Sequence, residues 1–517
     1  MDHFDARHCL IVATWNSCIR QIRLKGAEAP SGIPIERLEP VGEAAATEKD
    51  SPVPLELRFG RANRALAIAS QLPWYPFLLS GAYVSNGFAD FHIHVALLPR
   101  ALLIAIAGTA LVLAAFAAIT WRIRVASAAS GVLGCLLLTP APLTIVLMMA
   151  AAGAAAIFLL DRSGRIQWSL WCPRLNGYAL LLIAVVGGRW VLGGGIQQTA
   201  NDLRQLAPAA SVRADGPDIY LLLLDGYPRA DTQRSLFSVD PGALLAELGR
   251  LGFDHYPRSF AEYPSTNQTL ASMLFMDDLA AIDIPLNSQG HAPQPEWRQA
   301  LNANPAFEIA RAAGYEVVTI NPGWDAVALR HADRFIDTGG ISHFEQALVA
   351  QNGYGALIEA IAPAFFGDQR RHRVSAAFHT LETLSAERNG RPRLVWVHVP
   401  APHYPVLWNA DGSSFPVSLA DFSRYHREAP RRELLDEYGG NLRHLNELVV
   451  KVVSRVVAND PSAVVVVFSD HGSTGLGNRD EVHASFLAAK TPGYPWLFAA
   501  DPTPRTILGG LLAAYLE

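Results

Sequence analysis

Acidic and histidine side chains follow two short apolar runs of this sequence at the point where each run ends. The run 464–468 is followed after one residue by Asp470 and His471, and the run 219–224 is followed directly by Asp225. Two carboxylates and an imidazole are ligands for a divalent cation, and two oxygens with one nitrogen suit zinc or manganese better than calcium. The plainer alternative is that each run is a strand ending in an ordinary polar turn.

A third polar cluster spans residues 263–272, where Pro264 and several hydroxyl residues predict the start of a helix with Thr266 near its N-terminus. Backbone N–H groups at a helix N-terminus attract anions. A threonine hydroxyl is barely acidic, so it acts as a nucleophile only when a bound metal lowers its pKa. Thr266 therefore lies where an anion would bind, and its role as candidate nucleophile and metal ligand is what the family resemblance described below implies. It could instead be a simple helix cap, with Thr269 or Ser272 as the nucleophile.

The family resemblance described below selects two histidines, which makes them candidates to hold phosphoryl oxygens and to protonate a leaving alcohol. His403 lies between two prolines, and His483 follows His471 by twelve residues. Either could be a structural histidine instead, and His398, inside a predicted strand, is assigned to the core.

For two further groups of polar residues the sequence gives only a weak indication of their position. Arg330, His331 and Asp333 could line the pocket, although nothing in the sequence requires it. Asp436 and Asn441 lie in a helical pattern and are assigned to a solvated helix face.

The elements that must position these residues alternate along the second half of the chain. Strands are predicted at 219–224, 315–320, 393–399 and 464–468, with helical patterns between them at 241–251, 305–313 and 434–457. This alternation predicts an α/β domain with a mostly parallel sheet covered on both faces. Buried parallel strands deliver the residues at their carboxyl ends into a common crevice.

The first half of the chain has a different composition. Half of all residues are hydrophobic and the mean hydropathy is +0.17, with the excess between about residues 65 and 196. A bilayer needs roughly 20 apolar residues per helix. The pattern predicts about five transmembrane helices, at 65–84, 95–121, two within 125–160 divided by Pro140 and Pro142, and 175–196.

Positive charge sets the predicted orientation of these helices. Arginines precede the first predicted span and lie in two of the connections, whereas the connections 85–94 and 139–142 contain no Lys or Arg; the arginines are Arg58, Arg61, Arg64, Arg122, Arg124, Arg162, Arg165 and Arg174. The positive-inside rule places the N-terminus in the cytoplasm and the chain after about residue 197 outside. The predicted division is a poorly ordered extension (1–60), a transmembrane domain (61–198) and an extracytoplasmic catalytic domain (199–517).

Charge and cysteine content exclude several classes of protein. The formal net charge of −5 gives no reason to expect a nucleic-acid partner. All four cysteines precede residue 199. The C-terminal domain therefore contains no disulfide, no thiolate metal site and no cysteine nucleophile.

From about residue 217 to its end, the chain resembles the sulfatase-like branch of the alkaline phosphatase superfamily. With apolar helices ahead of that domain, it is similar to lipoteichoic acid synthases and lipid A phosphoethanolamine transferases. The resemblance implies an α/β/α sandwich and one catalytic divalent metal. It maps the metal ligands to Asp225, Thr266, Asp470 and His471, with Thr266 as nucleophile and His403 and His483 as further catalytic residues.

The sequence departs from that family in two respects. Gly226 stands where two-metal members carry a second carboxylate, so a second full metal site is not expected. Formylglycine sulfatases need a Cys/Ser-x-Pro-x-Arg motif, and the segment 263–272 contains neither cysteine nor arginine. A sulfatase of that type is therefore not expected.

The leading functional hypothesis is a metal-dependent transferase anchored in a bacterial inner membrane. It takes a phospho-substituent from a phospholipid and places it on an envelope glycan or lipid. One alternative keeps the site but makes water the acceptor, giving a phosphodiesterase or sulfatase-like hydrolase. Another is a non-catalytic membrane protein whose outer domain binds envelope partners.

Overall fold

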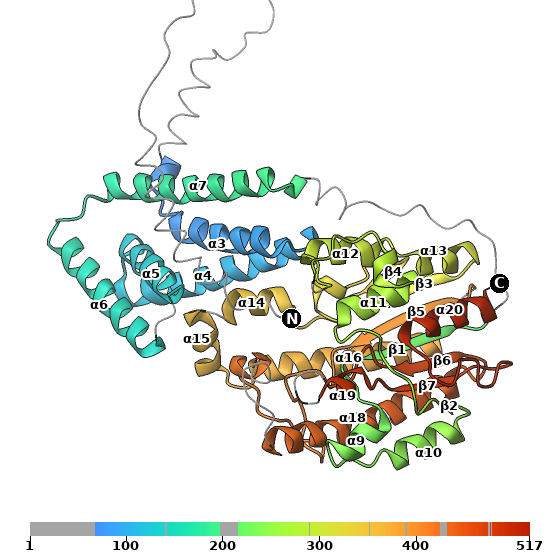
Figure 1. Ribbon diagram of the computed structural model, residues 1–517. Coiled ribbons are helices and arrows are strands. Elements are labelled where there is room, and N and C mark those ends of the chain that lie inside the picture. Colours follow the sequence, from blue (N-terminus) through green and yellow to red (C-terminus); the bar gives the residue numbers. More distant parts are fainter. Residues whose placement is uncertain are drawn as a thin grey trace, which may run out of the picture.

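The computed structural model describes residues 68–139, 142–196, 216–288, 290–350, 352–387, 390–423, 432–473, 476 and 478–516. Apolar helices come first along the chain, and a seven-stranded sheet with its covering helices follows (Figure 1). The predicted extension 1–60 lies outside the described residues, as does the connector between 197 and 215.

Five helices occupy the described part of the region predicted to cross the membrane. Three of them are long and apolar enough to span a bilayer: α4 (Leu98–Thr120, preceded by the 3-10 turn η1, Val95–Leu97), α6 (Leu143–Arg162) and α7 (Trp168–Leu192). The helices α3 (Tyr75–Phe91) and α5 (Ile123–Leu137) have 17 and 15 residues. The structure thus supports three candidate spans, and the count of five stays a prediction.

The boundaries of two apolar helices differ from the predicted ones. Pro76 lies in the first turn of α3, and the helix runs on to Phe91 rather than ending at 84. Proline is tolerated in a first turn because its missing N–H has no partner there in any case. Pro76 therefore belongs to the start of α3. Helix α7 begins at Trp168, before the predicted 175, and contains Pro173.

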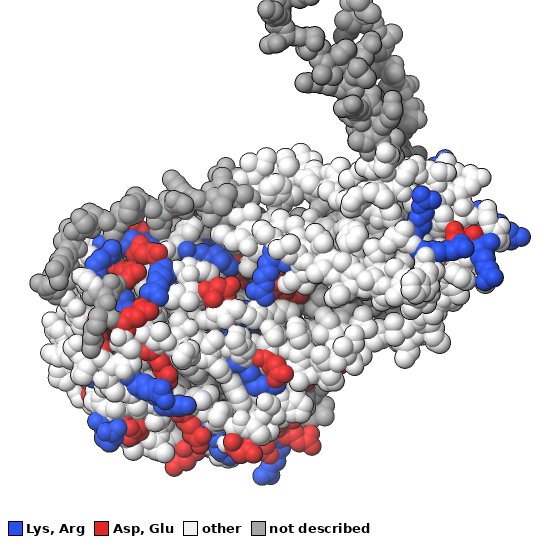
Figure 2. Space-filling view, turned by 180° about the vertical axis from the view of Figure 1, so that it is seen from behind, with Lys and Arg blue, Asp and Glu red and all other residues white. Residues whose placement is uncertain are grey.

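The two ends of the apolar helices differ in charge. Arg122, after α4, forms an ion pair with Asp161 in the last turn of α6, so two arginine-bearing connections meet at one end. Figure 2 shows charged atoms at that tip, separated by an uncharged belt from the charged surface of the sheet domain. At the other end, the backbone N–H of His94 donates to Asp325 of the sheet domain at 2.9 Å. The connection without Lys or Arg therefore faces the sheet domain.

The sheet has the strand order β2-β7-β6-β1-β5-β3-β4. The five strands from β6 to β4 pair in parallel, and β7 and β2 add two antiparallel strands at one edge. Their bounds are β1 Ile219–Leu224, β2 Asp254–His255, β3 Glu316–Ile320, β4 Arg334–Ile336, β5 Arg393–Val399, β6 Val464–Phe468 and β7 Leu487–Lys490. The predicted mostly parallel sheet is confirmed, and it includes all four predicted strands.

Alternate residues of the central strands face two separate helical layers. Leu222 and Leu224 of β1 lie in one core, with α10 (Gly242–Arg250), α16 (Phe365–Ala386) and α18 (Arg432–Asn459). Leu221 and Leu223 lie in the other, with α11 (Thr266–Phe275), α12 (Gln294–Asn302), α13 (Pro305–Ala312) and α20 (Pro504–Tyr515). Successive strand side chains point to opposite faces, which gives the predicted sandwich.

Shorter elements complete the domain and lie mainly between strands. They are α9 Ala230–Ser235, η2 Leu279–Ala281, η3 Asp325–Val327, α14 His343–Ala350, α15 Gly353–Ile361, η4 Leu419–Ser423 and α19 Arg479–His483. Of these, α14 and α15 lie beside the apolar helices (Figure 1).

Candidate metal and catalytic centre

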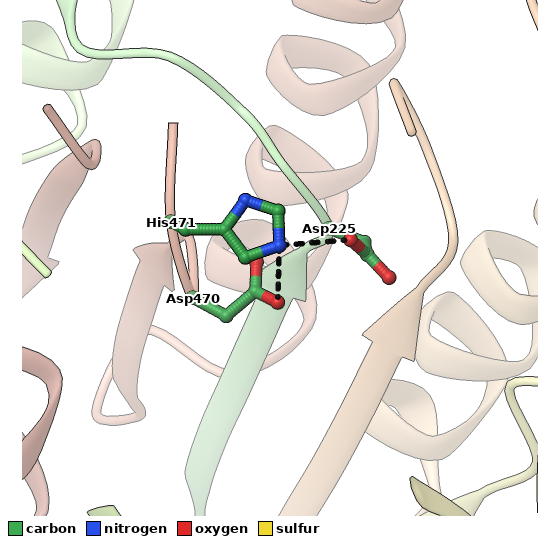
Figure 3. A group of neighbouring side chains, drawn as sticks. All are labelled: Asp225, Asp470 and His471. Atoms are coloured by element: carbon green, nitrogen blue, oxygen red, sulfur yellow. Dashed lines mark ion pairs between the residues drawn. The ribbon is translucent and has the colours of Figure 1, made fainter. Parts of the chain in front are cut away.

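The carboxyl ends of the neighbouring strands β1 and β6 bring three predicted residues together. Asp225 follows β1 directly, and Asp470 and His471 follow β6 after Ser469. Because the two strands are parallel, both chains leave the sheet at the same edge. Figure 3 shows the three side chains converging there.

The Nε2 atom of His471 is the meeting point of the cluster. It lies 3.3 Å from Oδ2 of Asp470, 3.7 Å from Oδ1 of Asp225 and 3.3 Å from Oγ1 of Thr266. The other ring nitrogen, Nδ1, lies 2.6 Å from the carbonyl oxygen of Gly472. A carbonyl can only accept, so Nδ1 carries the proton and Nε2 faces the acidic side chains. All four clustered side chains belong to buried residues.

Two oxygens of this cluster are unsatisfied. Oδ1 of Asp225 and Oδ2 of Asp470 are buried and accept no hydrogen bond from the described part of the chain. Their partner oxygens are engaged: Oδ1 of Asp470 accepts from the N–H of Gly226 at 3.0 Å, and Oδ2 of Asp225 lies 3.2 Å from Nε2 of His398. Buried acceptors are almost always satisfied, so this pair marks a place for a cation.

The donor atoms fit one divalent ion. Asp225, Asp470 and His471 each offer a ligand atom, and these atoms lie within 4.8 Å of one another. Ligands about 2.0 to 2.2 Å from a tetrahedral zinc lie about 3.3 to 3.6 Å from each other. The separations of 3.3 and 3.7 Å around Nε2 of His471 are close to that spacing.

The charges around the cluster keep the carboxylate of Asp225 ionised. Burial alone would raise the pKa of Asp225, but the charge of His403 and the hydrogen bond and charge of His398 hold that pKa well below its usual range. Burial alone would lower the pKa of His471, whereas the charges of Asp470 and Asp225 raise it. Asp225 is therefore available as a metal ligand.

Helix α11 begins at Thr266, and its hydroxyl is the one that faces the cluster. The cap position belongs to Ser265, one residue earlier, so Thr266 is not the helix cap. Oγ1 of Thr266 lies 3.3 Å from Nε2 of His471. The hydroxyls of Thr269 and Ser272 donate to backbone carbonyls at 3.2 and 2.6 Å. The geometry therefore favours Thr266 over both alternatives.

His403 lies beside Asp225 in the loop after β5. Its backbone N–H donates to the carbonyl oxygen of Asp225 at 3.0 Å, which ties this loop to the end of β1. Its Nδ1 lies 3.2 Å from the carbonyl oxygen of Tyr404. The structure thus places His403 next to the cluster through its backbone and its charge.

Asn441 holds that loop in place from α18. Its Oδ1 accepts from the backbone N–H groups of Leu407 and Trp408 at 3.3 and 3.2 Å, and the residue is fully buried. The prediction of a solvated face was wrong for Asn441, because the loop after β5 covers this side of α18. It was right for Asp436, which is exposed.

His483 lies beside the loop that leads to Thr266. Its Nδ1 is 2.6 Å from the carbonyl oxygen of Ala261, and its own carbonyl oxygen accepts from the N–H of Ala261 at 2.8 Å. These two contacts orient His483 through the loop before α11. The structure does not bring it into the hydrogen-bonded cluster formed by the described residues.

His398 is a site residue that the sequence did not reveal. It is buried within β5, as its assignment to the core predicted, but its Nε2 lies 3.2 Å from Oδ2 of Asp225. The two residues are 173 positions apart. A histidine within a buried strand gives no signal of such a contact, because the contact depends on which strand lies next to it.

Two basic side chains that the sequence analysis did not select also surround this region. Arg370, on α16, has a buried Nε without a hydrogen-bond partner in the described part of the chain, and its Nη2 donates to the carbonyl oxygen of Pro400 at 3.4 Å. Burial lowers the pKa of Arg370 to about 10, while the charge of Asp225 opposes that shift. Burial, with the charges of Arg370 and His403, lowers the pKa of His343 to about 4. Arg370 thus lies within the electrostatic reach of Asp225.

The residues near position 330 that could have lined the pocket serve the sheet edge instead. Asp333 accepts from Nε of Arg311 at 2.9 Å, and Arg330 pairs with Asp325 at 3.3 Å. The carbonyl oxygen of His331 accepts from Arg311. These contacts hold the chain between η3 and β4 against α13.

Comparison with known proteins adds a family match. Residues 255–490 match the family model described as Sulfatase. The matched range begins after Asp225 and includes the other candidate site residues, Thr266, His403, Asp470, His471 and His483. No curated protein sequence matches the chain.

Several solved structures are similar to this chain at low identity. The soluble domain of lipooligosaccharide phosphoethanolamine transferase A from Neisseria meningitidis is 14% identical over 59% of this chain and 90% of that chain, with a TM-score of 0.38. The C-terminal periplasmic domain of EcEptC from Escherichia coli, in complex with Zn, is 14% identical over 60% and 85%, with a TM-score of 0.37. A 2-O GAG sulfatase is 11% identical over 58% and 70%, with a TM-score of 0.37.

Proposed function

We propose that this chain, whose residues 255–490 match the Sulfatase family model, is a membrane-anchored, metal-dependent transferase. It moves a phospho-substituent from a phospholipid to an envelope lipid or glycan through a threonine nucleophile. The observation that carries the proposal is the convergence of Thr266, Asp225 and Asp470 on Nε2 of His471 at one buried point.

The proposed chemistry assigns a role to each clustered residue. Asp225, Asp470, His471 and Thr266 hold one divalent cation, zinc or manganese, which when bound lowers the pKa of the hydroxyl and offsets phosphoryl charge. Oγ1 of Thr266 forms a bond to phosphorus, and the bond from phosphorus to the leaving alcohol breaks. The Thr266 hydroxyl gives up its proton to solvent, and one of the two candidate acids, His403 or His483, donates one proton to that alcohol while the other holds a phosphoryl oxygen. An acceptor hydroxyl then attacks phosphorus and gives its proton to the histidine that donated one, and the bond from phosphorus to Oγ1 of Thr266 breaks.

Arg370 supports an anionic substrate for this site. A buried guanidinium Nε without a partner among the described residues is satisfied when an anionic oxygen reaches it. Arg370 also acts on the charge of Asp225, so a phosphoryl group bound between them would be held by a cation on either side once a metal is present. We assign Arg370 to substrate binding and His343 to packing beside it.

The proposed orientation keeps the N-terminus in the cytoplasm and the catalytic domain outside a bacterial inner membrane. Two observations support it. The connection between α3 and α4, which has no Lys or Arg, touches the sheet domain, since Nη1 of Arg298 donates to His92 and the N–H of His94 donates to Asp325. The arginine-bearing connections meet at the opposite end. We retain 61–198 and 199–517 as the proposed domains.

A reporter fusion tests this orientation. A reporter that is active only outside the cytoplasm, fused after Glu517, is expected to be active. An inactive fusion of a stably expressed chain would overturn the orientation and leave the chemistry of the site open to separate test.

Labelled phospholipids test the activity. The purified full-length protein is incubated with phosphatidylethanolamine or phosphatidylglycerol carrying a labelled head group, and label attached to protein is followed. Attachment to the peptide 263–272 is expected, because it contains Thr266. Release of label into water without attachment indicates the hydrolase, and no reaction with either lipid contradicts the transferase. The anchor favours a lipid donor because tethering raises the effective concentration of the site near the bilayer.

A further inference from the structure

The catalytic domain itself presents an apolar segment next to the membrane helices. Helix α15 and the turn that follows it to Phe365 contain one charged residue, Glu359. Ile361 is 76% exposed, and Ala356, Ala360 and residues 362–364 are exposed as well. A contiguous apolar surface of this kind marks an interaction site rather than ordinary soluble surface.

Contacts place this segment at one particular end of the apolar helices. Helix α15 packs against α5 and α6 (Figure 1). The hydroxyl of Tyr354 donates to the carbonyl oxygen of Gly134 at 3.3 Å, and a Cβ on Gly353 would lie 3.0 Å from Leu137. Gly134 and Leu137 are in the last turn of α5, next to the connection that has no Lys or Arg. Under the orientation proposed above, this is the outer end.

The one charge in the segment is turned away from its exposed surface. The Oε1 atom of Glu359 accepts a hydrogen bond from the backbone N–H of Leu419 in η4. The carboxylate is therefore satisfied within the catalytic domain. The exposed positions on both sides of it, Ala356, Ala360 and Ile361, are apolar.

We propose that α15 and the turn to Phe365 lie in the outer interface of the membrane, so that the catalytic domain rests on the lipid surface. We expect lipid to cover this surface because the segment is continuous with α5 and α6. The apolar side chains of those two helices are themselves expected to face lipid. An amphipathic interfacial segment buries its apolar face about 5 to 10 Å into the boundary between head groups and acyl chains. The inference rests on the proposed orientation and not on the chemistry of the site.

This seating brings the lipid surface close to the candidate site. Helix α16 begins at Phe365, and Arg370 follows five residues later, about 7.5 Å along the helix axis. The same helix therefore starts in the lipid interface and carries Arg370 to the neighbourhood of Asp225. Arg370 therefore lies about one and a half helical turns from the proposed lipid interface.

Depth-dependent quenching of a fluorescent label tests the seating. The full-length protein, in vesicles of phosphatidylethanolamine and phosphatidylglycerol, carries a single label at Ile361→Cys; the native cysteines Cys9, Cys18, Cys135 and Cys172 are first replaced. Lipids with nitroxide-labelled acyl chains are expected to quench the label at a depth of about 5 to 10 Å, and aqueous iodide is expected to have little effect. Ala356→Cys provides a second exposed position in the same helix.

Two matched positions control for exposure and for insertion. Ile309→Cys on α13 is an exposed apolar position on the other face of the sheet, and there iodide is expected to quench and the lipid nitroxides are not. Leu111→Cys in the middle of α4, 73% exposed, is expected to be quenched by the lipid nitroxides. If iodide quenches the label at both Ile361→Cys and Ala356→Cys while lipid nitroxides still quench it at Leu111→Cys, then α15 does not lie in the membrane interface, and the membrane anchor itself is unaffected. Loss of lipid quenching at Leu111→Cys as well overturns the membrane anchor together with the seating.

Discussion

An aspartate lies at each end of strand β1, and the two carboxylates differ in how fully they are hydrogen-bonded. Asp218, just before the strand, is saturated: its carboxylate accepts from the backbone N–H and Nε of Arg393 at 2.7 and 2.9 Å, and from the hydroxyl of Tyr220 at 3.1 Å. Arg393 is buried, with its side chain 1% exposed. At this end of the sheet, Asp218 and Arg393 therefore form a buried ion pair in which the carboxylate has hydrogen-bond partners.

Asp225, just after the strand, is left incomplete. Among the described residues, one of its oxygens lies near His398 and the other accepts no hydrogen bond. Asp470, at the end of the neighbouring strand, also has one such oxygen. A buried carboxylate that the protein does not saturate has a cost in stability, which a bound ligand can offset. Satisfied charges at one end of β1 thus stabilise the fold, whereas unsatisfied charges at the other end mark the candidate site.

The largest expected effect follows from removing the hydroxyl at the incomplete end. Thr266→Ala is expected to lower turnover by roughly 10⁴- to 10⁶-fold, the range seen when a catalytic nucleophile or its partner is removed. Stability should change by only about 1 kcal/mol, the net contribution of one hydrogen bond such as that between Oγ1 of Thr266 and His471. Initial rates of head-group transfer and the thermal midpoint measure the two effects.

Thr269→Ala is the matched control for the nucleophile. Thr269 lies three residues further along the same helix, and its hydroxyl donates to the backbone carbonyl of Tyr263, so activity should be retained. Full activity in Thr266→Ala, together with no covalent adduct on the peptide 263–272, would replace the covalent mechanism by direct attack of water or the acceptor.

A smaller loss is expected for the two candidate acids. His403→Ala and His483→Ala should each reduce turnover by roughly 10²- to 10⁴-fold, the usual contribution of general acid-base help. Bound metal should remain, because neither residue belongs to the donor set of Asp225, Asp470 and His471. Loss of the metal in either variant, measured by elemental analysis, would assign that histidine to the metal site instead.

The paired aspartates give the most direct test of the comparison. Asp218→Asn should lower the free energy of unfolding by about 2 to 3 kcal/mol, because the buried Arg393 loses its nearest counter-charge and keeps only Glu387, at 3.4 Å, and it should keep the metal. Asp225→Asn should lose the metal and the activity, and its loss of stability should be smaller than that of Asp218→Asn, since His398 and His403 favour the ionised carboxylate but only one of its oxygens has a partner among the described residues. Elemental analysis and denaturant unfolding measure both.

Loss of the metal in Asp218→Asn, together with the larger loss of stability in Asp225→Asn, would refute the distinction between the two ends of β1.

The wild-type protein is expected to hold about one equivalent of zinc or manganese, because one donor set is present among the described residues. Two equivalents, both absent from Asp225→Asn, would contradict the single ion expected from Gly226.

The smallest effect is expected for a residue that only orients a ligand. His398→Gln should weaken metal affinity by about 10- to 100-fold, the usual consequence of losing a partner that holds a metal ligand. A metal titration in competition with a chelator measures it. His379→Gln, an exposed histidine on α16, should leave the affinity unchanged. Equal affinity in both variants would show that His398 does not position Asp225.

Much of the fold was predictable because local patterns determine it. The strands 219–224, 393–399 and 464–468 were predicted with the bounds that the structure has, since continuous β-branched and leucine runs of that length suit buried strands. The strands β2 and β4, at the two edges of the sheet, and β7, next to β2, were not predicted. They have only two to four residues, too few to give a period, and their pairing with a neighbouring strand defines them.

The candidate site was predictable in part. Asp225, Asp470 and His471 were found from the sequence because parallel strands bring the residues that follow them to one edge. The role of Thr266 came from its place at a helix start and from a family resemblance. The structure adds that Thr269 and Ser272 donate elsewhere, which depends on how α11 is rotated against the sheet.

The sequence by itself determined which segments are apolar, where the central strands end and which polar side chains follow them, because each of these depends on neighbouring residues along the chain. Only the tertiary structure decided which of those side chains are satisfied. Asp218 finds Arg393 at 175 positions' distance, and Asp225 finds His398 at 173. The same residue type on one strand therefore becomes a structural ion pair at one end and an open ligand at the other. The physical reason is that burial makes an unsatisfied charge costly, and strand order decides which partner is near enough to satisfy it.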